Sequence, residues 1–466
     1  MILAATLLSG AAERLRVPQV ALFLALGLGL GSHGLGLIDL RLGAPVLPAI
    51  ATLSLVLVLF TDAVSVDPDE LRTHRRLALL ILGPGTILSA ALVGFAGWAL
   101  LGLAPAAAAI LGAALASTDP VLLRGLLRRP GVPRAARHAL GIESGLNDLV
   151  LLPIVLGGMA LLARQGPGDR LDWTLRAFQL FVLGPAAGVL VGYAGVRLLE
   201  AVRRRVGIRR DYESLYAIGV ALTAYAAAEA VHGSGFLAAA TAGLTIAVTD
   251  AELCDCFLDF GQAAAEVFLL FTFVALGGSL IWGGLDIVSW RTVAFVAIAL
   301  TARTAVLALA LVRMPIDRPS RRLIVWFGPR GLSALLLVLL PVFTGMLGSQ
   351  YLFDVAALVV LASVVLHGGA VMLLPLRAPG PAVSAPEAIP EAKPAPPSAE
   401  RITIDEVRRL LAGGDPVRLV DVRTERTWRR SESQAGGAIR LPPDEAAERA
   451  AELALPRHDW LIAYCT

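Results

Sequence analysis

The chain has 466 residues, of which 56% are hydrophobic and only 17% are charged, and its mean hydropathy is +0.73. This composition excludes an ordinary soluble domain and is typical of a membrane protein with many spans, whereas the net charge of +3 excludes nothing by itself. Three cysteines exclude a disulfide framework, and the single lysine, Lys393 in Ala-Lys-Pro, excludes a phosphate-binding GxxxxGK[ST] loop. We therefore expect a carrier driven by an ion gradient, not an enzyme, with no cofactor and no nucleic-acid partner.

Thirteen apolar runs predict transmembrane helices, because a span needs about 20 mostly apolar residues. The first run has only twelve residues before Glu13, so we expect it either to begin upstream of the printed sequence or to lie partly at the membrane surface. The pattern predicts an all-α polytopic protein within the lipid bilayer. The predicted spans cover residues 1–13, 18–32, 45–65, 77–102, 104–127, 139–163, 173–199, 212–232, 235–250, 262–282, 286–312, 321–346 and 351–376.

Arginines are distributed unevenly between the loops on the two sides of the membrane. With the N-terminus outside, the inside loops carry twenty arginines and the outside loops carry five. Because loops on the cytoplasmic side are enriched in basic residues, this distribution predicts thirteen spans, a cytoplasmic C-terminal domain and a location in the inner (plasma) membrane. The inside groups lie at residues 14–16, 72–76, 124–137, 197–210 and 313–322.

Two consecutive predicted spans contain acidic motifs. The first reads Ser117-Thr118-Asp119-Pro120 and the second reads Glu143-Ser144-Gly145-Leu146-Asn147-Asp148. A carboxylate within the membrane is costly, so each is a functional-site candidate by default. The alternative is that arginines neutralise these acids or that they lie at span ends. That alternative is much weaker for three acids with Thr, Ser and Asn between them, namely Asp119, Glu143 and Asp148.

The spacing within these motifs indicates how they bind a cation. Pro120 predicts unwound backbone over Ser117–Asp119, because proline removes a donor and clashes with the preceding turn. Unwound backbone at membrane depth lines a cavity and offers its carbonyls to a cation. On the next span Ser144 and Asp148 share a face, as do Glu143 and Asn147. Hydroxyl, carboxylate and carbonyl oxygens suit a hard monovalent cation, and a carboxylate can carry a proton instead.

A second break is predicted at Gly328-Pro329-Arg330-Gly331, in the later half of the membrane region. Paired interrupted helices in corresponding positions indicate a carrier built from inverted repeats, with two crossing helices and a site between them. A buried Arg330 needs an acid, and Glu143 is the predicted partner; the alternative is that Arg330 reaches the inner interface. An interhelical hydrogen bond or a span-end cap is the simpler interpretation of the remaining polar positions, which are Asp62, Glu229, His232, Glu266 and His367.

The composition changes after the last span. Residues 377–400 are rich in proline and alanine and predict a semi-rigid linker between the membrane domain, 1–376, and a soluble region, 401–466. A short helix at Ile402–Leu411 and strands at Val417–Val422 and Trp460–Tyr464 predict a small α/β domain.

The intramembrane motifs resemble those of NhaP-type monovalent cation:proton antiporters, within the sodium/hydrogen exchanger family, over roughly residues 10–376. The resemblance implies a thirteen-helix homodimer in which a core domain moves against a dimer domain. It implies that Asp119 and Asp148 bind Na⁺ (or Li⁺) and protons alternately, with oxygens from Ser144 and Thr118, so that Na⁺ lies at Asp119, Asp148 and Ser144. It also implies a structural Glu143–Arg330 ion pair, support from Pro120 and from Arg303 in Thr301-Ala302-Arg303, and, through Asn147, exchange of one cation for one proton.

The soluble region resembles a rhodanese domain. Leu419-Val420-Asp421-Val422-Arg423 is similar to the hallmark strand of that family, and Gly436-Gly437-Ala438-Ile439-Arg440-Leu441-Pro442 is similar to its second motif, with Gln434 where the family usually has histidine. Ile462-Ala463-Tyr464-Cys465 resembles the strand that leads to the catalytic cysteine. The printed sequence stops at Thr466, so we expect a truncated domain that is inactive as given, with Cys465 as the rhodanese candidate.

Three alternatives to an electroneutral sodium:proton antiporter remain at this stage. A potassium:proton antiporter would use the same hard oxygens. A membrane-anchored sulfurtransferase is a different class, but an anchor needs no intramembrane acids. A channel is the third, although paired broken helices with protonatable carboxylates favour alternating access.

Overall fold

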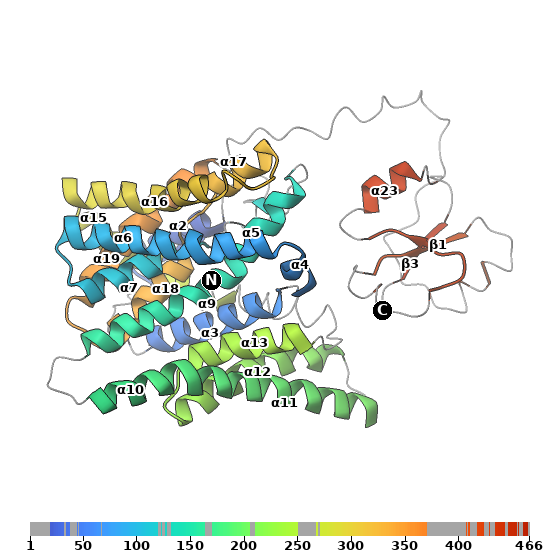
Figure 1. The fold of residues 1–466 in the computed structure, drawn as a ribbon, viewed down its shortest axis with the longest axis horizontal. Helices are drawn as coiled ribbons and strands as arrows, with labels where there is room; N and C mark the ends of the chain where they lie inside the picture. Colours follow the sequence, from blue (N-terminus) through green and yellow to red (C-terminus); the bar gives the residue numbers. More distant parts are fainter. Residues whose placement is uncertain are drawn as a thin grey trace. The chain divides into compact units, whose positions relative to one another are not determined.

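Helices make up the described part of the first of two units, Met1–Pro381, and a small parallel sheet lies in the second, Ala382–Thr466 (Figure 1). This computed structural model describes residues 19–31, 34–37, 44, 46–66, 68–119, 123, 126–127, 132–163, 170–205, 210–249, 267–268, 271–370, 407, 409–410, 417–423, 428, 434–442, 446–453, 455 and 460–464. The first predicted span, Pro120, the predicted linker and Cys465 therefore lie outside the described residues.

Most helices of the first unit lie in predicted apolar runs, whereas α4 (Pro68–Thr73) lies in the predicted loop between the spans 45–65 and 77–102. Their bounds are α2 (Gln19–Leu30), α3 (Val46–Val64), α4 (Pro68–Thr73), α5 (Arg75–Leu80), η1 (Ile81–Gly85), α6 (Thr86–Leu101), α7 (Pro105–Ala116), α9 (Arg134–Leu162), α10 (Arg170–Phe178), η2 (Gln179–Leu183), α11 (Gly184–Arg205), α12 (Arg210–Ala230), α13 (Gly235–Thr249), η3 (Leu280–Trp282), α15 (Gly283–Asp286), α16 (Trp290–Ala310), α17 (Arg318–Trp326), α18 (Leu332–Phe343), α19 (Ser349–Ser363) and η4 (Val364–Gly368).

Six of the described helices are long and apolar enough to cross a membrane. They are Val46–Val64, Arg75–Leu101, Arg134–Leu162, Thr174–Val202, Trp290–Ala310 and Ser349–Gly368. The shorter apolar helices include α7 and α18, which are the pieces left by the two predicted breaks. The described residues thus confirm a helical protein that crosses the membrane several times, and the count of thirteen spans stays a prediction.

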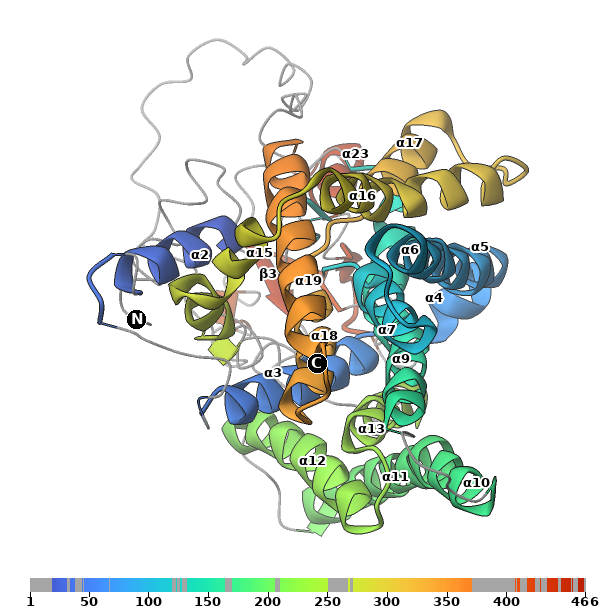
Figure 2. The same ribbon diagram turned by 90° about the vertical axis from the view of Figure 1, so that its left-hand side faces the viewer.

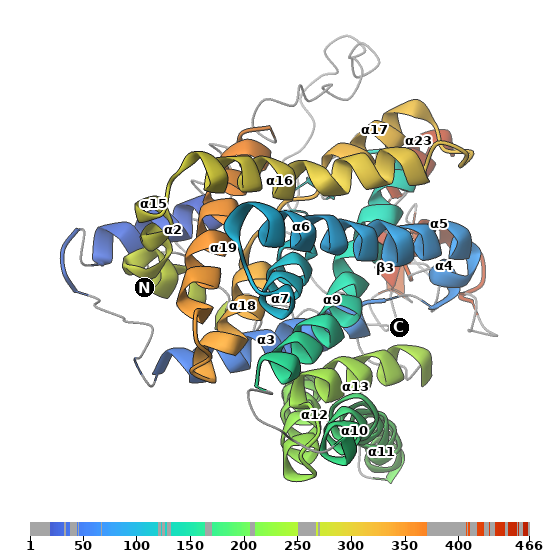
Figure 3. The same cartoon turned by 60° about the vertical axis from the view of Figure 1, so that its left-hand side comes forward.

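The helices of the first unit fall into two groups. Helices α11, α12 and α13 pack on one another, and α3 packs against α13 (Figures 2 and 3). In the other group α6 packs against α7 and α16, while α18 lies beside α19 and α7. The contact between α6 and α7 is very close, because a Cβ at Gly112 would lie 2.4 Å from the Ala90 carbonyl oxygen. Small residues permit such close contact between membrane helices.

The second unit contains a three-stranded parallel sheet in the order β2-β1-β3, in which β1 is Val417–Asp421, β2 is Ile439–Arg440 and β3 is Trp460–Tyr464. Helix α23 (Ala446–Glu452) lies between β2 and β3 in the sequence. The two strands predicted from the sequence are confirmed. Since the strands are parallel, their carboxyl ends lie at one edge of the sheet.

Candidate ion-binding site

The first break in the membrane unit follows α7. The helix stops at Ala116, and Ser117 has extended backbone with φ −60° and ψ 135°. Ser117, Thr118 and Asp119 are at most 1% exposed, and helical backbone is present again at Leu123. The predicted interruption is therefore confirmed, and it presents polar groups in the interior of the helical unit.

The second break separates α17 from α18 and lies against the first. Residues 327–331 are not helical. The Asp119 N–H donates to the Pro329 carbonyl at 2.9 Å, and the Arg330 guanidinium Nη1 donates to the carbonyls of Ala116 and Ser117 at 2.6 and 3.0 Å. The two unwound segments therefore meet, as expected for a site built between paired broken helices.

Asp119 follows α7 in the sequence, but its side chain lies against the first residue of α18. Its Oδ2 accepts from the Leu332 N–H at 3.0 Å, at a helix end where unpaired N–H groups favour an anion. Gly331 makes room for this contact, because a Cβ built there would lie 1.6 Å from Asp119 Oδ2. The glycine of the second break is thus required by the carboxylate of the first.

Asp148 lies on α9 and faces the same place. It is 5% exposed, and its Oδ1 accepts a short hydrogen bond from the Ser117 hydroxyl. The Ser333 side chain, in the first turn of α18, also interacts with this carboxylate, and Asp119 acts on it through its charge. Asp119 and Asp148 are therefore brought together with hydroxyl groups from both broken helices.

Asn147, the neighbour of Asp148, holds the first break to α9. Its Nδ2 donates to the Thr118 hydroxyl at 2.7 Å, and both side chains are 1% exposed. Its Oδ1 is buried, and no hydrogen-bond partner for it lies among the described residues. The predicted oxygen donor Thr118 is thus at the site, with a buried amide oxygen nearby that has capacity for a ligand or a water molecule.

Ser144 is less directly engaged than the sequence predicted. Its hydroxyl donates to the Gly141 carbonyl of the same helix at 3.2 Å, and the residue is 9% exposed. Ser117 contacts the Asp148 carboxylate instead. Sequence reasoning included Ser117 in the break but gave its side chain no role, because the direction of a hydroxyl on unwound backbone does not follow from spacing.

The predicted pairing of Glu143 with Arg330 is wrong. Glu143 binds Arg303 of α16, whose Nε and Nη2 donate to the two carboxylate oxygens at 2.5 Å each. This bidentate geometry occupies both oxygens of the acid. Gly328 leaves space for the arginine, since a Cβ there would lie 2.6 Å from Arg303 Cδ. Arg303, expected only as motif support, is thus the ion-pair partner.

Arg330 is fully buried and hydrogen-bonds the C-terminal end of α7. Its Nη1 satisfies two carbonyls at the C-terminus of α7, where a cation is favoured. Its Nε and Nη2 are buried, and within the described part of the chain neither has a hydrogen-bond partner. The alternative that Arg330 reaches the membrane surface is excluded, because the residue is 0% exposed.

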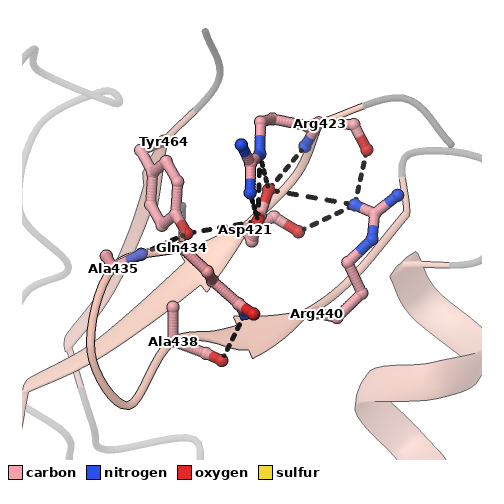
Figure 4. Close-up of polar contacts among 7 residues, drawn as sticks. All are labelled: Asp421, Arg423, Gln434, Ala435, Ala438, Arg440 and Tyr464. Carbon is pink, nitrogen blue, oxygen red and sulfur yellow. Dashed lines mark hydrogen bonds and ion pairs between the residues drawn. The ribbon is translucent and has the colours of Figure 1, made fainter. Parts of the chain in front are cut away.

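The second unit has its own buried charge cluster at the carboxyl edge of the sheet (Figure 4). Asp421 accepts from Nε and Nη2 of Arg423, at 2.9 and 2.6 Å, and from the Tyr464 hydroxyl at 3.2 Å. Arg440 donates to the Arg423 carbonyl at 2.5 Å, and Gln434 donates to the Ala438 carbonyl at 3.0 Å. Hydrogen bonding to Arg423 holds the pKa of the Asp421 carboxyl below its ordinary value of 3.8.

The chain is similar to several known proteins. A family model described as "Sodium/hydrogen exchanger, transmembrane" matches residues 2–374. The K(+)/H(+) antiporter NhaP of Alkalimonas amylolytica is 27% identical over 368 residues, which are 78% of this chain and 62% of that protein. The K(+)/H(+) antiporter NhaP2 of Shewanella oneidensis is 27% identical over 372 residues, 78% of this chain and 63% of that protein.

Two further similar proteins are described by their names as sodium antiporters. The Na(+)/H(+) antiporter NhaS2 of Synechocystis is 28% identical over 247 residues, 53% of this chain and 43% of that protein. The structure of the sodium proton antiporter MjNhaP1 from Methanocaldococcus jannaschii at pH 8 superposes with a TM-score of 0.63 at 19% identity, covering 80% of this chain and 96% of that one. This likeness shows the fold of the membrane unit. The chain spans under two thirds of the length of the curated relatives.

Proposed function

Because the chain belongs to the sodium/hydrogen exchanger family, we propose that it is a secondary transporter that exchanges a monovalent cation for protons by alternating access at Asp119 and Asp148. One observation carries this proposal: two buried carboxylates lie where two broken helices meet. A carboxylate can hold a proton or help to replace the hydration shell of a cation, so each ligand displaces the other.

Hard oxygens near the two carboxylates supply a cation site. Ser117 and Thr118 offer hydroxyl groups, and Asn147 offers its buried Oδ1, which has no hydrogen-bond partner among the residues that the structure describes. Ser144 joins this set when its hydroxyl turns away from the Gly141 carbonyl of its own helix. Carboxylate, hydroxyl and amide oxygens suit Na⁺, Li⁺ and K⁺ alike, so ligand type does not select the cation.

Potassium is the cation that the sequence relatives favour. The two relatives matched over 368 and 372 residues are named K(+)/H(+) antiporters, whereas the sodium antiporter NhaS2 is matched over 247 residues. We therefore place potassium before sodium and lithium, which reverses the order expected from the motifs alone. Dequenching of a pH-sensitive dye in inverted vesicles, after addition of K⁺, Na⁺ or Li⁺ as chloride salts, tests this order.

The charges at the site support one-for-one exchange. Glu143 is neutralised by Arg303, so Asp119, Asp148 and Arg330 remain, with a summed charge of one negative unit. One proton or one monovalent cation brings this sum to zero. The membrane potential, which contributes about 2.3 kcal/mol per charge per 100 mV, then does no work on the cycle. A transport rate that doubles when a potential of either sign is imposed would contradict electroneutral exchange.

Assembly and topology complete the proposal. We place the protein in the plasma membrane as a homodimer of thirteen-helix subunits with inverted repeats, with the N-terminus outside and the region after 376 in the cytoplasm. The domains are 1–376 for transport, 377–400 for the linker and 401–466 for a rhodanese-like module. The parallel sheet with Asp421 and Arg423 supports that last assignment. We propose no sulfurtransferase activity for it.

A further inference from the structure

The unwound segment between α17 and α18 leaves backbone groups without partners in a helix. Four N–H groups at the start and four carbonyls at the end of any helix need other partners. Here the Arg330 N–H donates to the Ser363 hydroxyl of α19 at 2.7 Å, and Ser363 is 0% exposed. A side chain 33 residues further along the chain therefore holds the residue that precedes Gly331.

His367 engages the other side of the same break. It is 3% exposed, lies in the π-helical segment η4 and places its Nδ1 3.1 Å from the Ser363 hydroxyl oxygen. The imidazole also hydrogen-bonds the backbone of Trp326, the last residue of α17. Its ring packs edge-on against Phe327, with 5.9 Å between centroids and 89° between planes.

The hydrogen bonds form a defined chain if the imidazole is neutral. The Ser363 hydroxyl accepts from the Arg330 N–H and has one proton to donate, which Nδ1 of a neutral histidine can accept. The other ring nitrogen then carries the proton and donates to the Trp326 carbonyl. The charged groups that act on His367 are Arg330 and Arg303, both cations.

We infer that Ser363 and His367 are positioning residues that clamp the second broken helix and so fix Arg330 at the ion site. One turn of α19 and η4 holds Trp326 and Arg330 at the same time, and Figure 2 shows α19 running beside α18. Arg330 in turn binds the Ser117 carbonyl, and the Ser117 hydroxyl binds Asp148. Neither Ser363, the last residue of α19, nor His367 of η4 contacts the carboxylates in these hydrogen bonds, so both act through Arg330. This inference rests on the proposed exchange function.

Amide hydrogen exchange of the full chain in detergent tests the clamp without any transport. Ser363→Ala and His367→Ala should speed exchange of the amides from Phe327 to Leu332 about fivefold, since each change removes a net hydrogen-bond contribution of ~1 kcal/mol. Ser363→Thr keeps the hydroxyl and should retain slow exchange. Val359→Ala removes buried apolar atoms from α19, and it should leave these amides unchanged. Unchanged exchange in both polar variants overturns the clamp.

The pH profile of cation:proton exchange then distinguishes a positioning role of Ser363 and His367 from a purely structural role. Loss of the clamp lets Ser117 move away from Asp148, and loss of that hydrogen bond favours the protonated carboxyl. The acidic limb of the profile should therefore move to higher pH, by about one unit, in Ser363→Ala and His367→Ala. Ser363→Thr and Val359→Ala should keep the wild-type limb. If amide exchange is faster but the acidic limb of the pH profile stays in place in all variants, Ser363 and His367 have only a structural role. That outcome overturns the inference.

Failure of the proposed function gives a different result. If the wild-type protein exchanges none of K⁺, Na⁺ and Li⁺ for protons, the antiport proposal falls, while the amide measurement still decides whether the clamp exists. In that case the inference is retained only as a clamp on Arg330.

Discussion

Two kinds of buried carboxylate lie within the same membrane unit, and their partners differ. Glu143 has both oxygens bound by the Arg303 guanidinium, at 2.5 Å each. Asp148 interacts with the hydroxyl groups of Ser117 and Ser333, and it lies close enough to Asp119 for the two charges to interact. A bidentate arginine occupies both oxygens of a carboxylate, whereas hydroxyl groups can reorient to serve a proton or a cation. The partner, not burial, separates a structural acid from an exchanging one.

The largest effect on transport is expected at the exchanging acid. Asp148→Asn keeps the shape of the side chain but cannot alternate between a proton and a cation, so exchange should fall to the background of empty vesicles. Dye dequenching after addition of K⁺ or Na⁺ measures this, and a normal elution profile in size-exclusion chromatography shows that the variant folds. Wild-type dequenching in the variant would remove Asp148 from the mechanism. Asn147→Ala is the matched neighbour, and it should retain some exchange because both carboxylates remain.

Substitution of the structural acid, Glu143, should lower the stability of the folded protein, and this loss is the main effect that we expect. Removing one member of a buried pair leaves an uncompensated charge and costs about 3–5 kcal/mol. Glu143→Gln and Arg303→Met should therefore each lower the thermal stability in detergent, and the double variant should recover much of the loss.

Arg330 provides the control for this cycle. Because Arg330 is hydrogen-bonded to the Ala116 and Ser117 carbonyls and interacts with Glu143 through charge alone, the Glu143→Gln and Arg330→Met double variant should recover much less than the Glu143 and Arg303 double variant. Strong recovery in that double variant, with none for Glu143 and Arg303, would restore the pairing predicted from the sequence.

A smaller effect distinguishes the two serines near Asp148. Ser117→Ala removes a hydrogen bond to a carboxylate, of ~1.5 kcal/mol, and should raise the apparent KM for the cation about tenfold. Ser144→Ala removes a hydroxyl that binds the Gly141 carbonyl of its own helix, so its effect should be clearly smaller. Initial rates over a range of cation concentrations give both values. An equal or larger effect at Ser144 would support the ligand set expected from the motifs.

The contrast between the acids also explains what the sequence could predict. Apolar runs located most of the described helices of the membrane unit, and Pro120 with Gly328-Pro329-Arg330-Gly331 located the two breaks, because these signals are local. Whether Arg303 or Arg330 pairs with Glu143 depends on contacts between residues far apart in the sequence. It depends on which guanidinium reaches both carboxylate oxygens across three helices, and on the space left by Gly328.

Long-range hydrogen bonds to the unwound backbone were missed for the same reason. His367 was expected to form an interhelical hydrogen bond or a span-end cap, without a named partner, and Ser363 and Ser333 were given no role. A sequence-level signal existed only in part: an unwound segment needs partners for its amides, but the sequence does not say which helix supplies them. The site was therefore predictable in its acids and breaks, and unpredictable in the residues that orient them.

The smallest effect on transport is expected from the acid of the second unit, which is of the structural kind. Hydrogen bonding to Arg423 keeps the pKa of Asp421 below 3.8, so ionised Asp421 stabilises the folded unit above about pH 4. This contribution is lost as the pH falls through the lowered pKa of the folded state. Asp421→Asn should therefore speed amide exchange in β1 and β3 at pH 7, and it should flatten the pH dependence of that exchange below pH 4. Glu452→Gln, at an exposed position on α23, is the control and should change neither. Cation:proton exchange by the same full-length Asp421→Asn protein should equal that of the wild type, because no atom of Asp421 belongs to the ion site. A transport defect in this variant would mean that the buried charge cluster of the sheet acts on the membrane unit.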